Sequence, residues 1–212
     1  METAYKLLSL TKTNILRLIK LPMEEAINIE ELIRPETLLE NAILENPTFR
    51  KGLLWGEPRY GHPEGKIVLH IQEVLENIEN LNLDAETRRK LRLIAIVHDT
   101  FKNVEPKAYP RDWSRHHSVL AKEFLEQYSD EKDVLNVVEL HDEAYYAWRM
   151  IALYGQKEKG EKRLERLLDR IGNDLPLYYL FFKCDTETGD KIQAPLKWFT
   201  KIVQEIEVSA NK

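Results

Sequence analysis

The sequence predicts an all-α protein. From Lys66 to the C-terminus, apolar residues recur at three- and four-residue steps almost without interruption, which is the period of an amphipathic helix. Runs in which apolar and polar residues alternate, as in a half-buried strand, are absent from the sequence. Only 8 of the 212 residues are glycine, the weakest ordinary helix former, and 32% are charged, which suits solvated helices.

The N-terminal segment is predicted to form a helical extension. Residues 1–52 contain two to four short amphipathic helices, which could cover the main domain, cap its pocket or form the contact of a homodimer. Residues 52–65, GLLWGEPRYGHPEG, are rich in glycine and proline and are predicted to be a loop. We therefore divide the chain into an N-terminal helical extension, residues 1–61, and a main domain, residues 62–212.

The main domain is predicted to contain a series of helices joined by short loops. These helices are expected at 66–81, 85–101, 112–128, 131–148, 161–171, 175–188 and 195–207. Asp84 can cap the second, because its side chain can accept hydrogen bonds from the first turn. Pro110 and Asp112 introduce the third, and Pro195 begins the last. Residues 103–111, NVEPKAYPR, form a loop of the kind that often contacts substrates.

Composition excludes several classes of protein. The net charge of −5 and the pI of about 5.8 do not indicate a surface for a nucleic-acid polymer. No apolar run is long enough to cross a membrane, and the amphipathic N-terminus lacks the cleavage site of a signal peptide. The single cysteine, Cys184, cannot form an internal disulfide, which fits a reducing compartment. We therefore expect a cytoplasmic protein.

Polar side chains occupy the apolar faces of five predicted helices. His98, for example, follows Ile94 and Ala95 on one stripe, at steps of four and three residues. The same spacing places His70, His117, His141 and Asp185 on the apolar faces of their own helices, with His116 one position off the stripe. A buried polar group without a partner costs about 1–3 kcal/mol. A single buried histidine is usually an ordinary hydrogen-bonded core residue. Four imidazoles and one carboxylate on separate helices are explained more simply if all of them bind a shared cation.

The adjacent pair His98–Asp99 closes the apolar run LRLIAIV. Neighbours on a helix point about 100° apart, so both side chains reach ions only beside a cavity, where Asp99 could bridge two metals. A second pair, His141–Asp142, is interpreted as a ligand followed by a supporting or solvent-facing carboxylate. Imidazole and carboxylate ligands predict one or two divalent transition-metal ions, Fe, Mn, Ni, Co or Zn, in preference to Mg or Ca.

The order of these residues resembles the HD superfamily of metal-dependent phosphohydrolases. The shared order is a histidine, a His-Asp pair, two further histidines and an aspartate. It is matched by His70, His98–Asp99, His116 or His117, His141 and Asp185, and the resemblance covers roughly residues 62–190. The resemblance implies an HD-domain helical bundle with these residues as metal ligands. Lys102 also matches the lysine of the HDxGK pattern of many members, although Phe101 replaces its glycine.

The resemblance implies hydrolysis of a phosphate mono- or diester, such as a nucleotide or a small phosphorylated metabolite. In that reaction Asp99 and Lys102 would act at the catalytic centre, and Lys102, Arg111 and Arg115 would bind the phosphate. The additional histidines are similar to those of two-metal members, which include cyclic-dinucleotide phosphodiesterases and oxygen-activating di-iron enzymes. A di-iron oxygenase and a non-catalytic nucleotide-binding module therefore remain alternatives.

Helical phase distinguishes His117 from His116. His117 continues the stripe formed by Leu120, Ala121 and Phe124, so it is the preferred ligand. If the helix begins later than predicted, His116 lies in a turn and could point inward instead. His62 lies in the loop at residues 52–65, where it could line the mouth of the pocket.

Overall fold

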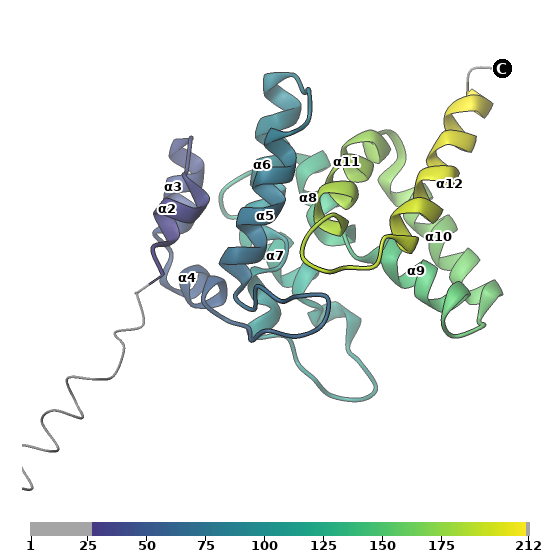
Figure 1. Cartoon of the computed structure of the whole chain (residues 1–212), viewed down its shortest axis with the longest axis horizontal. Coiled ribbons are helices and arrows are strands. Elements are labelled where there is room, and N and C mark those ends of the chain that lie inside the picture. Colours follow the sequence, from purple (N-terminus) through teal and green to yellow (C-terminus); the bar gives the residue numbers. More distant parts are fainter. Residues whose placement is uncertain (1–26, 211–212) are drawn as a thin grey trace, which may run out of the picture.

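The computed structural model describes residues 27–210, and every regular element in that range is a helix (Figure 1). The all-α prediction is thus confirmed, and the helices expected within residues 1–26 lie outside the described range. The helices are α2 (Ile29–Ile33), α3 (Leu38–Leu44), α4 (Pro47–Leu53), α5 (Ile67–Glu79), α6 (Ala85–Val97), α7 (His117–Leu125), α8 (Lys132–Leu140), α9 (Glu143–Ala152), α10 (Lys157–Ile171), α11 (Leu175–Thr186) and α12 (Ala194–Ala210). Three short 3₁₀ turns join them, η1 (Thr100–Asn103), η2 (Trp113–Arg115) and η3 (Gly172–Asp174).

Two of the predicted helices are each interrupted at a His-Asp pair. The helix expected at 85–101 ends at Val97, so that His98 and Asp99 form a turn before η1. The helix expected at 131–148 ends at Leu140, and α9 begins after Asp142. A continuous helix would direct two neighbouring side chains about 100° apart. In both turns the backbone of the histidine and the aspartate keeps right-handed helical dihedrals, and both side chains of each pair reach one centre.

Helix starts follow the capping residues of the sequence. Asp84 accepts hydrogen bonds from the backbone of Glu86 and Thr87, as predicted. The helix expected at 112–128 begins only at His117, because the backbone of His116 is extended and its side chain caps the helix. The helix therefore begins later than the sequence predicts, and helical phase alone does not decide which way His116 points.

One apolar core joins the N-terminal helices to the remainder of the described chain. In Figure 1, α2, α3 and α4 lie on one side of α5 and α6, while α9, α10 and α12 lie on the other. Ile29, Ile43 and Phe49 belong to the same buried cluster as residues of α5, α6, α7, α8 and α11. The core thus runs across the predicted boundary at residue 61. None of the helices in residues 27–210 combines the length and hydropathy needed to cross a bilayer.

The helix α4 packs directly against the segment that follows Asp99. Phe49 stacks on Phe124, with ring centroids 5.2 Å apart, and lies edge-on to Phe101. Gly52 allows the closest approach, because a Cβ atom there would overlap the carbonyl oxygen of Thr100. The backbone after Asp99 is therefore held in place by a helix of the N-terminal segment.

A buried ion pair ties α3 to α6. Arg92 and Glu40 are 4% and 2% exposed, and the guanidinium Nε lies 3.2 Å from a carboxylate oxygen of Glu40. Arg92 also donates to the carbonyl oxygen of Arg34, at the end of α2. Because Arg92 also lies 3.3 Å from Glu36 and 3.6 Å from Glu79, removing Glu40 would cost the buried charged hydrogen bonds between α3 and α6 without leaving the guanidinium unpaired.

We expect Glu40→Ala to destabilise the whole protein, by about 1.5–3 kcal/mol in urea unfolding. Glu45→Ala, at an exposed position after the same helix, should change the free energy of unfolding by less than about 0.5 kcal/mol. An unchanged urea midpoint in Glu40→Ala would mean that the N-terminal helices unfold independently of the main domain.

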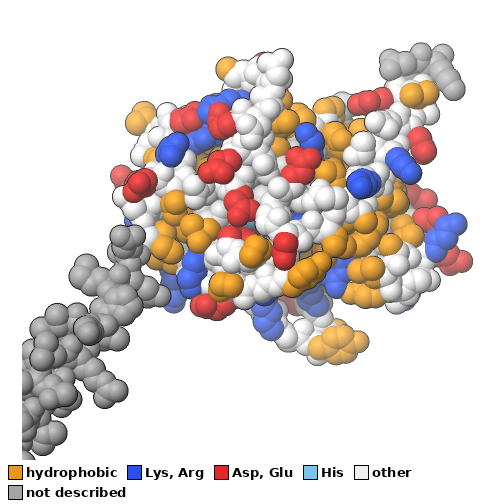
Figure 2. Space-filling view, in the orientation of Figure 1, with side chains coloured by type: hydrophobic (Ala, Val, Ile, Leu, Met, Phe, Trp, Pro, Cys, Tyr) orange, Lys and Arg blue, Asp and Glu red, His pale blue; other side chains and the backbone are white. Residues whose placement is uncertain are grey.

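The charged side chains show no large patch of one sign on the face that Figure 2 displays. Acidic and basic side chains are interspersed there with apolar ones. The face therefore offers no basic track of the kind that follows a nucleic-acid backbone.

Candidate metal centre

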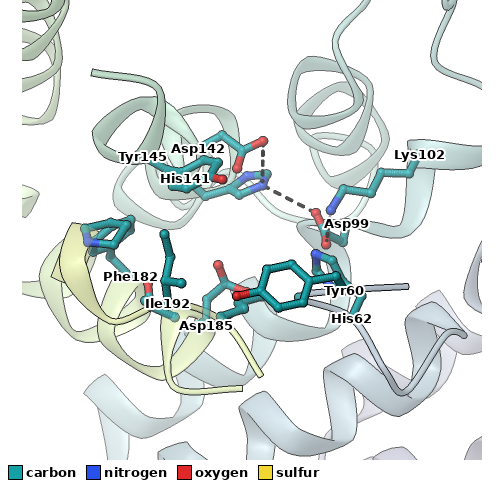
Figure 3. A pocket seen from close by; sticks show the side chains of 14 residues that line it. Tyr60, His62, Asp99, Lys102, His141, Asp142, Tyr145, Phe182, Asp185 and Ile192 are labelled. Atoms are coloured by element: carbon teal, nitrogen blue, oxygen red, sulfur yellow. Dashed lines mark hydrogen bonds and ion pairs between the residues drawn. The ribbon is translucent and has the colours of Figure 1, made fainter. Parts of the chain in front are cut away.

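Imidazole and carboxylate side chains from separate segments meet at one buried centre. They are His70 on α5, His98 and Asp99 in the turn after α6, His117 at the start of α7, His141 and Asp142 in the turn after α8, and Asp185 on α11. The four imidazoles are all buried. Figure 3 shows Asp99, His141, Asp142 and Asp185 around a common pocket.

The first cluster comprises His70, His98, Asp99 and Asp185. The Nε2 atoms of His70 and His98 are 3.3 Å apart. The Oδ1 atom of Asp185 lies 2.9 Å from His70 Nε2, and Asp99 Oδ2 lies 3.5 Å from His98 Nε2. Nitrogen ligands bind an ion such as zinc at about 2.0–2.1 Å, so two ligands of one ion lie about 3 Å apart. The spacing of these donor atoms therefore fits a single metal ion.

The second cluster comprises His117, His141, Asp142 and the other oxygen of Asp99. The Nε2 atoms of His117 and His141 are again 3.3 Å apart. His117 Nε2 lies 3.3 Å from Asp99 Oδ1 and 3.4 Å from Asp142 Oδ2. Asp99 thus contributes one carboxylate oxygen to each cluster. The centre could hold a metal ion on either side of this carboxylate.

Backbone carbonyls fix the tautomers of two of the histidines. Nδ1 of His98 lies 2.9 Å from the carbonyl oxygen of Ala95, and Nδ1 of His141 lies 2.9 Å from that of Val138. Because a carbonyl oxygen only accepts, each Nδ1 carries the hydrogen and each neutral ring presents the lone pair of Nε2 to the centre. This is the form in which imidazole binds a metal.

The oxygen Asp99 Oδ1 is buried and has no hydrogen-bond partner among the described residues. His117 Nε2 and His141 Nε2 are its polar neighbours, at 3.3 and 3.5 Å. Neither nitrogen makes a hydrogen bond to this oxygen. A buried carboxylate oxygen without a donor costs about 1–3 kcal/mol or more, so the position favours a cation.

The carboxylates attract positive charge to the second cluster. Burial disfavours the charged form of His141, yet the carboxylates of Asp142 and Asp99 raise its pKa to about 9. Burial likewise opposes ionisation of Asp99, but Lys102 and His98 hold the pKa of its carboxyl well below the usual range. In the first cluster, burial and the ammonium of Lys191 lower the pKa of His70 to about 4. The two clusters therefore differ in the charges beside them, although their donor atoms are alike.

A carboxylate in the 103–111 loop supports His117. Glu105 is 7% exposed, and its Oε2 lies 3.3 Å from His117 Nδ1. Arg111 and Lys107 bind the same carboxylate. A carboxylate on the far nitrogen orients a ligand histidine and raises its basicity. The sequence analysis missed Glu105, because a glutamate in a polar loop carries no distinguishing pattern.

The structure separates His117 from His116. The Nδ1 of His116 lies 2.8 Å from Ser118 Oγ, and its Nε2 lies 3.2 Å from the hydroxyl of Tyr146. Its ring stacks on Trp113, behind His117. His116 therefore has its own partners. Its Nε2 also lies 3.7 Å from Asp142 Oδ2 and 3.9 Å from Glu105 Oε1, and Glu105, His116 and His117 form a further group whose donor atoms lie close enough to hold a metal ion.

Asp142 is the second donor that the sequence analysis did not recognise. It was interpreted as a supporting or solvent-facing residue, but it lines the pocket and its side chain is 24% exposed. A signal was present in the sequence, since His141–Asp142 ends an apolar helix just as His98–Asp99 does.

The pocket beside the centre is a cavity of about 230 Å³. Its polar wall contains His62 and Lys102, and the ammonium group of Lys102 contacts Asp99 Oδ2. Its apolar wall contains Tyr60, Tyr145, Phe182, Ile192 and Pro195. Of the predicted phosphate-binding arginines, Arg111 binds Glu105 and Arg115 is exposed, so neither lines this pocket.

Comparison with known proteins gives one match. The model of a protein family, the HD domain, matches residues 67–174, just over half of the chain. No curated protein and no solved structure matches the chain. The matched range contains His70, His98, Asp99, His117 and His141, whereas Asp185 lies beyond its end.

Proposed function

Because the chain belongs to the HD-domain family, we propose that it is a metal-dependent phosphohydrolase with two divalent ions at its catalytic centre. The observation that carries the proposal is the position of Asp99. Its two carboxylate oxygens face separate pairs of imidazole nitrogens, and one of those oxygens is buried without a hydrogen-bond donor. This is the arrangement expected of a carboxylate that bridges two metal ions.

The donor set also indicates the class of metal. His70, His98, Asp99 and Asp185 would hold one ion, and His117, His141, Asp142 and Asp99 would hold the other. Mixed imidazole and carboxylate ligands suit Mn, Fe, Co, Ni or Zn. Divalent ions of this kind lower the pKa of coordinated water and offset the negative charge of phosphoryl oxygens.

The side chains around the centre position the substrate and limit access of water. Lys102 places an ammonium group beside Asp99 at the pocket wall, where a phosphoryl oxygen can accept a hydrogen bond from it. Tyr145 and Phe182 form an apolar wall opposite. The carbonyls behind His98 and His141 keep the hydrogen of each ring on Nδ1, away from the substrate.

The proposal is tested by reconstituting the full-length protein after chelation. Mn, Fe, Co, Ni and Zn are added separately without oxygen, and bound metal and phosphate release from a panel of phosphate mono- and diesters are measured. We expect about two equivalents of the best metal per chain and metal-dependent release of phosphate.

Two results would contradict this proposal. Failure of the chain to retain any of these metals would refute the metal centre. Retention of iron with oxygen consumption, but without phosphate release, would favour the di-iron oxygenase instead. The full set of donors from His70 to Asp185 already argues against a non-catalytic nucleotide-binding module.

A further inference from the structure

Two lysines from different segments flank the first cluster. Lys102, in η1, contacts Asp99 Oδ2. Lys191, in the loop between α11 and α12, has its ammonium nitrogen 3.0 Å from Asp185 Oδ1 and 2.9 Å from the carbonyl oxygen of Asp185. Both lysines line the pocket, and their side chains are only 19% and 18% exposed. The centre is therefore bordered by an ammonium group on each of two carboxylates.

The loop that carries Lys191 is held on several sides. Gln193 donates hydrogen bonds to the carbonyl oxygens of Lys191 and Thr186. The backbone N–H of Gly189 donates to a carboxylate of α5, at 2.7 Å. Asp190 accepts a hydrogen bond, at 2.6 Å, from the loop that carries Tyr60 and His62. Lys191 thus occupies a position fixed by the fold, unlike a lysine on an open surface.

The remaining hydrogen-bonding capacity of Lys191 points towards an anionic ligand. An ammonium group has three N–H donors, and Asp185 accepts two of them. The third donor is available at the wall of the pocket. A phosphoryl oxygen placed over the first cluster would meet Lys191 on one side and Lys102 on the other.

The balance of charge distinguishes two classes of ester. The positive charge of two divalent ions and two ammonium groups would exceed the negative charge of the three carboxylates Asp99, Asp142 and Asp185. A phosphate monoester carries nearly two negative charges at neutral pH, since its second pKa is about 6, whereas a diester carries one. The centre therefore suits the monoester better.

The size and lining of the cavity restrict the leaving group. Its volume of about 230 Å³ lies below the range of roughly 300–1,000 Å³ that is usual for ligand pockets. Tyr60, Tyr145, Phe182 and Ile192 also line this cavity. A compact leaving group with a flat or apolar face fits this wall.

We infer that Lys191, together with Lys102, binds the phosphoryl group of the substrate, and that the substrate is a phosphate monoester with a compact leaving group. This inference rests on the proposed phosphohydrolase function and adds to it a residue and a substrate class.

The test compares the metal-loaded wild-type protein with Lys191→Met, which keeps the aliphatic stem and removes the charge. Lys183→Met is the matched control, because Lys183 lies on α11 outside the pocket and pairs with Glu187. The probes are 4-nitrophenyl phosphate, bis(4-nitrophenyl) phosphate and inorganic phosphate as an inhibitor. We expect Lys191→Met to lower kcat/KM for the monoester about 10- to 100-fold and to weaken inhibition by phosphate about 10-fold. The diester rate should change by less than about 3-fold, and metal content should not change.

Each other outcome separates this inference from the proposed function. Unchanged monoester kinetics in Lys191→Met would remove Lys191 from the binding site and leave the phosphohydrolase function intact. Loss of bound metal would show that Lys191 only supports Asp185. A wild-type preference for the diester would overturn the substrate class. If the wild type cleaves neither ester, calorimetry with inorganic phosphate decides the role of Lys191: weaker binding by Lys191→Met supports it, and equal binding by both proteins overturns it.

Discussion

Asp99→Ala is expected to lose metal from both clusters and to lower phosphatase activity by at least about three orders of magnitude. The reason is that one carboxylate supplies an oxygen to each pair of imidazoles, so its removal affects both ions. The helices should still form, because Asp99 lies in a turn and caps no helix through its side chain. Elemental analysis, far-UV circular dichroism and phosphate release measure the three effects.

A control and a contrasting variant sharpen this prediction. Asp169→Ala, at an exposed position of α10, should behave as the wild type. Asp142→Ala should lose metal only from the second cluster, since its carboxylate approaches His117 and His141. If Asp99→Ala retained two equivalents of metal, or lost only one, the bridging role would be refuted.

His117→Ala should lose one equivalent of metal and most activity, by about two orders of magnitude or more, whereas His116→Asn should keep both metals. His117 Nε2 faces Asp99 and His141, while the ring of His116 is occupied by Ser118 and Tyr146. Asparagine at position 116 retains the ability to cap α7, so a change in metal content would not reflect a lost cap.

Two substitutions at position 116 also test the capping role of His116. His116→Ala should lower the free energy of unfolding by about 0.5–2 kcal/mol through loss of the cap, and His116→Asn should restore most of it. Retained metal in His117→Ala together with lost metal in His116→Asn would reverse the assignment of the two histidines.

The helical period predicted the inward side chains that lie within regular helices. His70 and Asp185 face the centre because apolar neighbours three and four residues away define a buried face. The same reasoning could not place Asp142, because a continuous helix would turn it away from His141. No proline or glycine marks the break after Leu140 in the sequence.

Residues in loops could not be found by periodicity. Glu105 reaches the centre through His117, and Lys191 reaches it through Asp185, and both lie in loops where no helical period applies. Arg115, by contrast, is close in sequence to the histidine pair and is predicted on that ground to bind phosphate, but it lies outside the pocket. Proximity along the chain therefore did not predict whether Arg115 lines the pocket, whereas the ordered histidines and aspartates lie close together in the structure.

The close packing of Gly52 on Thr100 has a consequence for how much of the chain makes up the catalytic unit. Any side chain at position 52 would push away the backbone immediately after Asp99, the residue shared by both clusters. That glycine lies outside the range matched by the HD-domain model. A fragment limited to the matched residues would lack this contact. We therefore expect that a fragment must include α4 as well as the metal-binding helices to preserve the geometry of the centre.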